Sequence, residues 1–540
     1  MEMHSSNLLR RLSELNKIGI ALSREKNLPR LLETILLAAK SITLADAGTL
    51  YKVTPEGKLK FEIVRTDSLN IAMGGTTGVA IPFPDLPLYS EQGEPNNNMV
   101  VAYSVLHDTT INIKDAYSEQ GFDFTGTRAF DQRTGYRSQS FLTVPLKNHE
   151  NDIIGVMQLI NALEPDTGKV RIFNKEDQQL VESLASQAAI ALTNRQLISQ
   201  LEVLFESLIK LINTAIDEKS PYTGGHCARV PELTMLLAEA TNNTDEGPLA
   251  DFHMNDKDRY ELKIAGLLHD CGKITTPVHI VDKSTKLQTL FDRIESVDTR
   301  FEVLKRDAEI QKLHAQLAAN GNEHTVKRAD EQYRARLAQL DGDREFLRKA
   351  NIGGEFMTAA DQARVEQIGA YIWRDPNGNV VPFLNSSEMA NLKIAKGTLL
   401  PEEREIINHH IVSTINMLEA LPWPKHLKNV PEFAGGHHER MDGKGYPRGL
   451  TGDRMSLQAR IMAIADIFEA LTARDRPYKL GKTLTEALTI LGRMKEDRHV
   501  DPDLFDVFIR RKVYLDYAKR FLEPYQIDEV DESRIPGYSP

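Results

Sequence analysis

Residues 435–447 read Gly-Gly-His-His-Glu-Arg-Met-Asp-Gly-Lys-Gly-Tyr-Pro and place two adjacent histidines, His437 and His438, before a run of turn-forming residues. Glycine and proline permit the irregular backbone that would let both imidazoles reach a metal ion. For an isolated His-His pair, a polar surface loop is the alternative reading. Because the chain carries further histidines and aspartates that can complete a site, the stretch indicates a metal centre.

Several of these further residues lie in segments that read as helices. An apolar stretch at residues 260–268 leads directly into His269 and Asp270. A nearly unbroken apolar stretch carries Asp466 as its one aspartate. Polar groups on buried helices need partners, so such residues indicate ligands. The candidate ligands outside the first motif are His226, His269, Asp270, His410 and Asp466.

The run His437-His438-Glu439, together with Asp442 to Pro447, resembles the signature of the HD-GYP family. These proteins are metal-dependent phosphodiesterases that act on cyclic di-GMP. The resemblance covers roughly residues 205–525, and it implies an all-α domain. It also implies hydrolysis of cyclic di-GMP to linear pGpG, with GMP as a further product, by a metal-activated bridging hydroxide. A receptor that binds the dinucleotide without cleaving it, and a hydrolase of another cyclic dinucleotide, remain alternatives.

The resemblance also selects the ligands. Adjacent residues on a helix point about 100° apart, so His409 and His410 would not serve one metal, and the family pattern selects His410. Seven ligands are too many for one metal with an open position, so two divalent metals are implied, with Asp270 as the bridge. Imidazole and carboxylate ligands favour iron or manganese, and zinc and nickel are also compatible. The implied ligands are His226, His269, Asp270, His410, His437, His438 and Asp466.

Some family members carry a glutamate four residues before the first ligand histidine, which supports a third metal. This chain has Tyr222 there, so we expect two metals.

Catalytic and substrate-binding residues follow from the same resemblance. We expect Asp270 and Lys273 to be catalytic, with Lys273 one helical turn after Asp270 on the same helix. Its ammonium would neutralise phosphoryl charge or protonate the leaving group. An alternative for the Gly-Tyr-Pro segment is a rigid turn beside the ligands. The expected substrate contacts are Arg476, Lys479, Gly443, Tyr446 and Glu469, the last at a position where the family often has Asp.

The N-terminal part, residues 1–195, predicts an α+β unit. Alternation of apolar and polar residues predicts strands, and amphipathic periodicity predicts flanking helices. The expected helices span residues 7–23 and 27–43 and a segment starting near 175, and the expected strands include 49–53, 59–64, 140–146 and 153–161.

This unit resembles a GAF sensor domain, an antiparallel sheet with flanking helices, over about residues 15–195. The likeness is carried by Val144-Pro145-Leu146 and by the segment from Gly155 to Leu159. Residues 111–117 and 130–136 partly resemble the subset of GAF domains that bind cyclic nucleotides. A domain without ligand, used for dimerisation, is equally compatible, so the ligand is unknown.

A signalling helix at residues 196–216 is expected to join the two parts. Spacings of three and four residues form an a/d seam, which favours a parallel homodimer, although packing onto its own domain is the alternative. Such a seam can transmit a small rotation or shift. The seam residues are Leu197, Leu201, Leu204, Leu208, Leu211 and Ala215.

Residues 286–395 interrupt the family pattern. Apolar residues stepping by three and four predict a helical hairpin that turns near Asn320-Gly321-Asn322. We interpret it as a structural or partner-binding arm rather than a catalytic part.

Composition limits the remaining possibilities. A chain of 540 residues predicts two or three domains, and its formal net charge of -11 argues against a nucleic-acid polymer as partner. Two cysteines, Cys227 and Cys271, form no disulfide scaffold, which fits a reducing cytosol. No apolar run has the length of a membrane span, and the N-terminus has no secretory pattern, so we expect a cytoplasmic protein.

Overall fold

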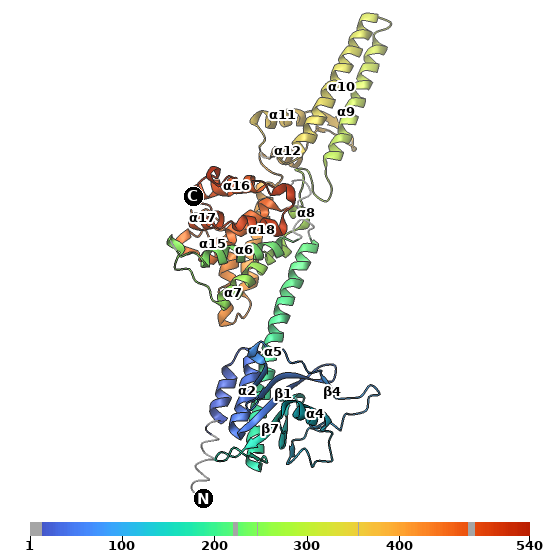
Figure 1. Cartoon of the computed structure of the whole chain (residues 1–540). Coiled ribbons are helices and arrows are strands. Elements are labelled where there is room, and N and C mark those ends of the chain that lie inside the picture. The colour runs from blue at the N-terminus through green and yellow to red at the C-terminus, as the bar shows by residue number, and fades with distance from the viewer. Residues whose placement is uncertain are drawn as a thin grey trace. The chain divides into compact units, whose positions relative to one another are not determined.

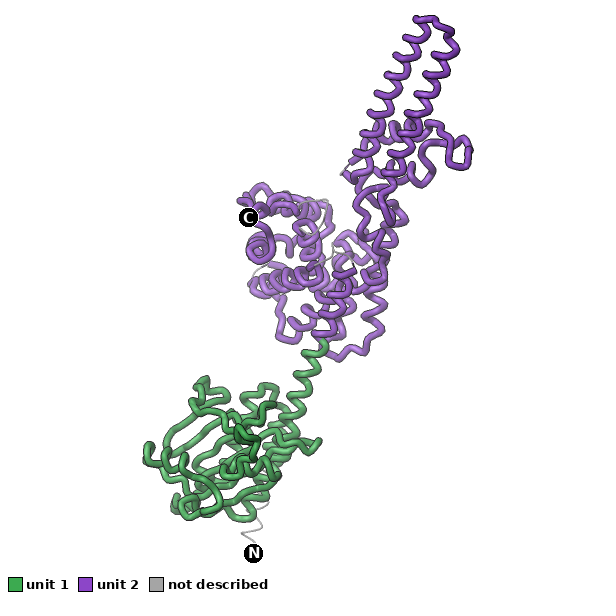
Figure 2. Tube along the Cα trace, turned by 90° about the vertical axis from the view of Figure 1, so that its right-hand side faces the viewer, with its two compact units in different colours: residues 1–205 green, residues 206–540 purple. Residues whose placement is uncertain are grey.

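The computed structural model describes residues 13, 15–219, 225–245, 247–354, 356–473 and 481–539. The chain divides into two compact units, residues 1–205 and 206–540 (Figure 2). Helix α5, Lys175–Lys219, begins in the first unit and ends in the second (Figure 1). Each unit has its own buried apolar residues.

The first unit is built on one antiparallel sheet, which among the described residues has the strand order β3-β2-β1-β7-β6-β5, with β4 beside β2 and β8 beside β7. Central strands β1 and β7 are paired along most of their length. The strands are β1 Ala45–Val53, β2 Lys58–Thr66, β3 Ile71–Gly74, β4 Leu86–Pro87, β5 Ile111–Ile113, β6 Phe141–Lys147, β7 Ile153–Leu163 and β8 Val170–Arg171.

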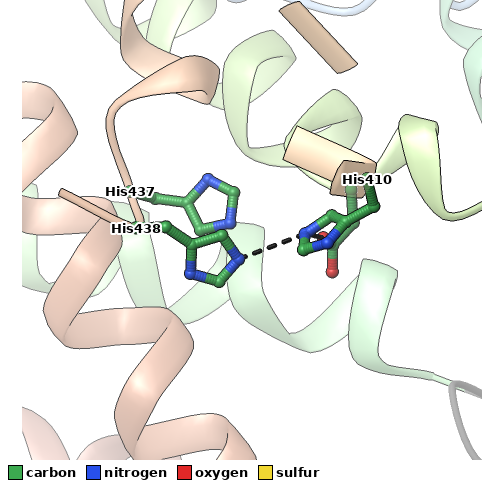
Figure 3. A group of neighbouring side chains, drawn as sticks. His410, His437 and His438 are labelled. Carbon is green, nitrogen blue, oxygen red and sulfur yellow. Dashed lines mark hydrogen bonds and ion pairs between the residues drawn. The ribbon is translucent and has the colours of Figure 1, made fainter. Parts of the chain in front are cut away.

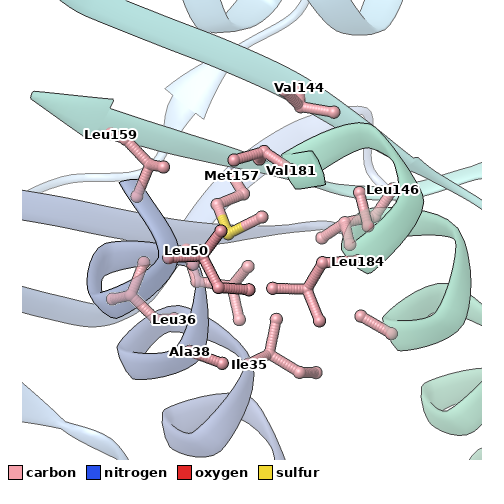
Figure 4. Packing of buried hydrophobic residues seen from close by; sticks show 14 of the residues in the cluster. Ile35, Leu36, Ala38, Leu50, Val144, Leu146, Met157, Leu159, Val181 and Leu184 are labelled. Atoms are coloured by element: carbon pink, nitrogen blue, oxygen red, sulfur yellow. The ribbon is translucent and has the colours of Figure 1, made fainter. Parts of the chain in front are cut away.

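Helices cover both faces of this sheet. Because successive side chains of a strand point to opposite faces, Leu50 and Tyr51 of β1 enter different clusters. Leu50 packs with α2, Leu28–Thr43, and with the first turns of α5 (Figure 4). Tyr51 packs on the other face with Val101 of α3, Val100–Leu106. The remaining helix between the strands is α4, Thr125–Thr134. The predicted α+β order with an antiparallel sheet is confirmed.

The second unit is helical around its core. Helix α7 starts at a capping box, in which Asn255 and Asp258 satisfy each other's backbone N–H groups. None of the helices in the described ranges combines the length and hydropathy needed to cross a membrane. The core helices are α6 His226–Asn242, α7 Asp256–Leu268, α8 Val278–Val281, α13 Pro401–Glu419, α14 Val430–Gly435, α15 Leu457–Thr472, α16 Leu484–Glu496, α17 Pro502–Arg510 and α18 Val513–Phe521.

A helical arm lies between α8 and α13 of this core, in the segment that we expected to be an insertion. Helices α9, Ile294–Ala318, and α10, Glu323–Asn351, lie side by side (Figure 1). The turn falls where the sequence predicts it, and Asn322 caps α10 by accepting the N–H of Thr325 at 3.2 Å.

The base of the arm has a core of its own, which includes Phe301, Leu347 and Phe383. It is therefore a small subdomain rather than a bare hairpin. Its ends meet where Thr398 donates a hydrogen bond to the carbonyl of Lys283 at 2.9 Å. The remaining elements of the arm are α11 Ala359–Gly369, β9 Ile372–Arg374, β10 Val380–Pro382 and α12 Ser386–Leu392.

Candidate metal centre

Seven histidines and aspartates, the predicted ligands, come together in the second unit as two groups that share Asp270. Within each group the possible ligand atoms lie within 4.8 Å of one another. Asp270 Oδ2 is 3.0 Å from His226 Nε2, and Asp270 Oδ1 is 3.2 Å from His410 Nε2, so this carboxylate faces both groups. The first group is His226, His269, Asp270 and Asp466; the second group is Asp270, His410, His437 and His438.

The ends of helices position most of these side chains. His226 is the first residue of α6, and His269 directly follows α7. His437 and His438 come just after α14, while Asp466 lies within the largely buried helix α15. Segments more than 200 residues apart along the chain thus meet at Asp270.

Backbone carbonyls orient three of the imidazoles. A carbonyl oxygen can only accept a hydrogen bond, so the ring nitrogen facing it carries the proton. The other nitrogen, Nε2, then keeps its lone pair for the centre of the group. In each case Nδ1 donates to the carbonyl three residues earlier, at 2.5 to 2.7 Å: His269 to Gly266, His410 to Ile407 and His437 to Ala434.

The arrangement of the Nε2 atoms fits bound cations. His410 Nε2 and His438 Nε2 are 3.1 Å apart (Figure 3), and His226 Nε2 and His269 Nε2 are 3.3 Å apart. Lone pairs that face each other this closely need a cation or a proton between them. The buried Nε2 of His437 has no hydrogen-bond partner among the described residues, and burial lowers the pKa of His437 to about 4. A neutral, buried imidazole with a free lone pair is what a metal ligand requires.

Lys273 lies beside the shared carboxylate, with its Nζ 2.5 Å from Asp270 Oδ2. Burial acts against the charge, but the carboxylates of Asp270 and Asp466 outweigh it and raise the pKa of Lys273. The ammonium therefore stays protonated at neutral pH.

The expectation that Lys273 continues the helix of Asp270 is wrong. Helix α7 ends at Leu268, and Lys273 lies in the 3₁₀ helix η3, Cys271–Thr275. The reason is close packing of Gly272 on α13: its N–H donates to Thr414 Oγ1 at 2.9 Å, and a Cβ there would overlap the carbonyl oxygen of His410.

Glu469, which we expected on the substrate side, lies behind His226. Its Oε2 is 2.5 Å from His226 Nδ1, and its Oε1 accepts a hydrogen bond from Arg229 Nε at 2.7 Å. Both oxygens are thus engaged by protein side chains, and the side chain is only 1% exposed. The sequence prediction missed Arg229, although an arginine three residues after a candidate ligand, one turn along a helix, was a readable signal.

Glu439 braces the loop that follows the paired histidines. This buried carboxylate accepts the backbone N–H groups of Arg448 at 2.7 Å and of Leu450 at 2.8 Å. A second tight contact lies within the loop, where a Cβ on Gly445 would lie 2.5 Å from Arg440 N. The loop is therefore held in one shape beside the ligands.

Tyr446 stacks on the ring of His438, a candidate ligand. Its ring centroid is 4.9 Å from that of His438, with the two planes 22° apart. The Tyr446–Pro447 peptide bond is cis, and Gly443 has a φ of 75°, a value that favours glycine.

Some predicted residues lie elsewhere. His409 is exposed while His410 is buried, as the family pattern implies. Arg476, Lys479 and Tyr222 fall outside the described residues.

Comparison with known families assigns the two units. Residues 27–192 match the family model of the GAF domain. Residues 223–361 and 386–504 match two family models of the HD domain, and the break between them falls in the inserted arm. The chain therefore contains a GAF domain followed by an HD domain.

Curated relatives include two bacterial enzymes. The chain is 48% identical over 81 residues to 3'3'-cGAMP-specific phosphodiesterase 1 of Vibrio cholerae, covering 15% of this chain and 19% of that protein. It is 37% identical over 114 residues to a cyclic di-GMP phosphodiesterase of Thermotoga maritima, covering 21% of this chain and 30% of that protein. The matches thus span less than a third of either relative.

Among solved structures, the GAF domain of a phosphoenolpyruvate-protein phosphotransferase from Coxiella burnetii is similar to this chain, with 14% sequence identity and a TM-score of 0.28. The match covers 36% of this chain and 99% of that chain.

Proposed function

We propose that this chain, a GAF domain followed by an HD domain, is a metal-dependent phosphodiesterase that hydrolyses cyclic di-GMP to linear pGpG, with GMP as a further product. The observation that carries the proposal is the pair of ligand groups joined by Asp270. Two carboxylates among the seven ligands balance only half of the charge of two divalent cations. The centre is then positive, which suits an anionic phosphodiester in a chain with a net charge of -11.

Each group would hold one ion, and Asp270 would bridge the pair. Imidazole and carboxylate donors suit iron or manganese, with zinc and nickel as alternatives. When bound, paired divalent ions supply an activated water and polarise the phosphodiester. The chain's own part is to present five imidazoles and two carboxylates whose possible ligand atoms lie close together.

Lys273 contributes a charge that does not depend on the metal. Its ammonium is fixed beside Asp270 by a contact of 2.5 Å. From there it can stabilise negative charge on the phosphoryl oxygens and give a proton to the leaving oxygen. We assign it that role together with Asp270.

Tyr446 is the described residue best placed to meet a substrate. Its ring covers His438, and its hydroxyl has no hydrogen-bond partner within the described ranges. Burial, together with the carboxylates of Asp466 and Asp270, raises the pKa of Tyr446. Gly443, Arg476 and Lys479 are proposed to complete the contacts to phosphate and guanine, since an arginine fork suits phosphate.

A second substrate is also supported. The relative from Vibrio cholerae is named for 3'3'-cGAMP, so this dinucleotide belongs in the test beside cyclic di-GMP. The decisive experiment gives the protein, loaded anaerobically with Fe²⁺ or Mn²⁺, each dinucleotide and follows the products by chromatography. A chain that binds two metal ions and a dinucleotide but cleaves neither substrate would be a receptor, and the enzyme proposal would fall.

We further propose a parallel homodimer in the cytoplasm, regulated through the GAF domain. The predicted seam on α5 supports it, because its five leucines are 45% to 66% exposed. Exposed leucines in an a/d pattern favour a second copy of the same helix. Sedimentation of the full chain at micromolar concentration tests this, and a monomer would contradict it.

A further inference from the structure

The last turns of α5 contact the segments that carry the first ligand group. Three polar side chains of this helix reach the backbone just before or just after a candidate ligand. They are Asn213, which contacts Leu267; Asp217, which contacts Gly225; and Lys219, which contacts Lys273, Ile274 and Thr276.

Lys219 makes the most extensive of these contacts. Its ammonium donates to the carbonyl of Thr276 at 2.7 Å, to that of Ile274, and to that of Lys273 at 3.5 Å. An ammonium group has three N–H donors, so these three carbonyls use them all. The carbonyls close the 3₁₀ helix η3, which begins directly after Asp270. Lys219 therefore fixes the far end of the segment whose near end is the shared ligand.

Asn213 and Asp217 hold the two neighbouring segments. The side-chain amide of Asn213 donates to the carbonyl of Leu267 at 2.9 Å, two residues before His269. The carboxylate of Asp217 accepts the N–H of Gly225 at 3.2 Å. Gly225 precedes His226 and has a φ of 84°, so glycine suits it. The backbone next to His226, His269 and Asp270 is thus tied to one helix.

The same part of α5 has two different faces. Ile209, Asn213 and Ile216 are buried, while Leu208 and Leu211 of the predicted seam are at least half exposed. An α-helix moves as a stiff rod, so a rotation or shift imposed at its seam moves all three polar contacts together.

We propose that Lys219, with Asn213 and Asp217, positions the first ligand group and thereby couples the orientation of α5 to metal binding there. The catalytic part of this inference rests on the proposed phosphodiesterase function, whereas the effect on metal binding does not. Apart from the shared Asp270, the ligand positions of the second group have none of these contacts among the described residues, so its ion is affected less.

The test replaces Lys219 by Met in the full chain, which keeps an unbranched side chain and removes all three donors. Titration of metal-free protein with Mn²⁺ should show one of the two sites, which we assign to the first ligand group, losing about tenfold in affinity, in the range typical of residues that orient ligands. Hydrogen exchange of residues 271–276 should speed up. With active protein, kcat should fall while KM stays within about twofold. Lys219→Arg should retain most of the affinity, because a guanidinium can also donate to carbonyls.

Lys210→Met is the matched control, since it removes the same charge from an exposed position of the same helix. If Lys219→Met binds Mn²⁺ and exchanges like the native chain, or if Lys219→Arg is as weak as Lys219→Met, the inference is overturned. Should the Met variant not fold, Asn213→Leu tests the same helix, and unchanged Mn²⁺ affinity there would also overturn the inference. If the native chain cleaves no dinucleotide, the proposed function fails, while titration and exchange still decide this inference.

Discussion

The two ligand groups share Asp270 but are supported in different ways. In the first group, Glu469 and Arg229 stand behind His226, and the Lys273 ammonium lies beside Asp270. In the second group, backbone carbonyls hold His410 and His437. The first group thus combines a backbone carbonyl behind His269 with side-chain charges behind His226. The two carbonyl-held rings of the second group rely on the backbone.

This difference bears on how each group responds to change. Charges in a buried site act strongly, so removing one alters the affinity of its neighbours for a cation. A ring held by a backbone carbonyl keeps its orientation as long as the helix or loop keeps its shape. The first group is therefore the adjustable one, and the second is as rigid as the fold.

Replacing Asp270, the residue that both groups share, should impair metal binding in both groups at once. Asp270→Ala takes a ligand from both groups and leaves Lys273 without its 2.5 Å partner. Paired metals supply several kcal/mol of transition-state stabilisation, so hydrolysis should fall by about 1,000-fold or more. Metal analysis should find fewer than two ions per chain, while circular dichroism stays native.

A control variant makes this result specific. His409→Ala removes an exposed histidine one position before a ligand, and it should leave both the metal content and the turnover as they are. Normal turnover by Asp270→Ala would contradict the assignment of the centre.

A change confined to the first group should weaken the binding of one ion and leave the binding of the other unchanged. Glu469→Gln keeps the side-chain volume but removes the charge that faces His226 and Arg229. We expect the first ion to bind about 10- to 100-fold more weakly, the effect typical of a lost carboxylate behind a ligand histidine. Titration with Mn²⁺ should resolve one weakened site and one native site. Equal weakening of both sites would show that the groups are not independently supported.

Local patterns in the sequence anticipated much of this architecture. Alternating residues predicted β1 and β7 of the sheet, and steps of three and four predicted α9 of the arm. A charged helix was expected after the turn, where α10 lies. These elements are decided by neighbours within one strand or helix. The base of the arm was not anticipated, because its core joins Phe301 to Phe383, and no short-range pattern records such a contact.

The site shows the same division. Motif positions predicted seven residues that the structure brings together, because ligand spacing is written locally around each helix end. The contacts that hold these residues in place could not be predicted as well from the sequence. Glu469 meets Arg229 across 240 positions, and the end of α7 depends on how Gly272 packs against α13. Both are tertiary effects: spacing along one helix could place Arg229 beside His226, but it could not pair Arg229 with Glu469.

The second group should respond through the fold rather than through charge. Glu439→Gln can still accept one of the two backbone N–H groups of Arg448 and Leu450, but its amide faces the other. Leaving a buried donor unsatisfied costs about 1–3 kcal/mol, so urea denaturation should show a loss of that size. The second ion should bind more weakly and the first should not. Native stability in this variant would show that Glu439 does not hold the loop.

Of the variants discussed, Tyr446→Phe should have the smallest effect, and it should change only substrate binding. The stacked ring on His438 remains, so both ions should bind with native affinity. Only the hydroxyl is lost, and since it has no partner in the described part of the chain, stability should not change. If the hydroxyl donates to the dinucleotide, KM should rise by about 2- to 12-fold, the equivalent of one hydrogen bond.

Tyr446→Ala, which also removes the ring, is the comparison variant: it should weaken the binding of the second ion as well. A Phe variant with native KM would confine Tyr446 to packing against His438, and the Gly-Tyr-Pro segment would then be a rigid turn beside the ligands.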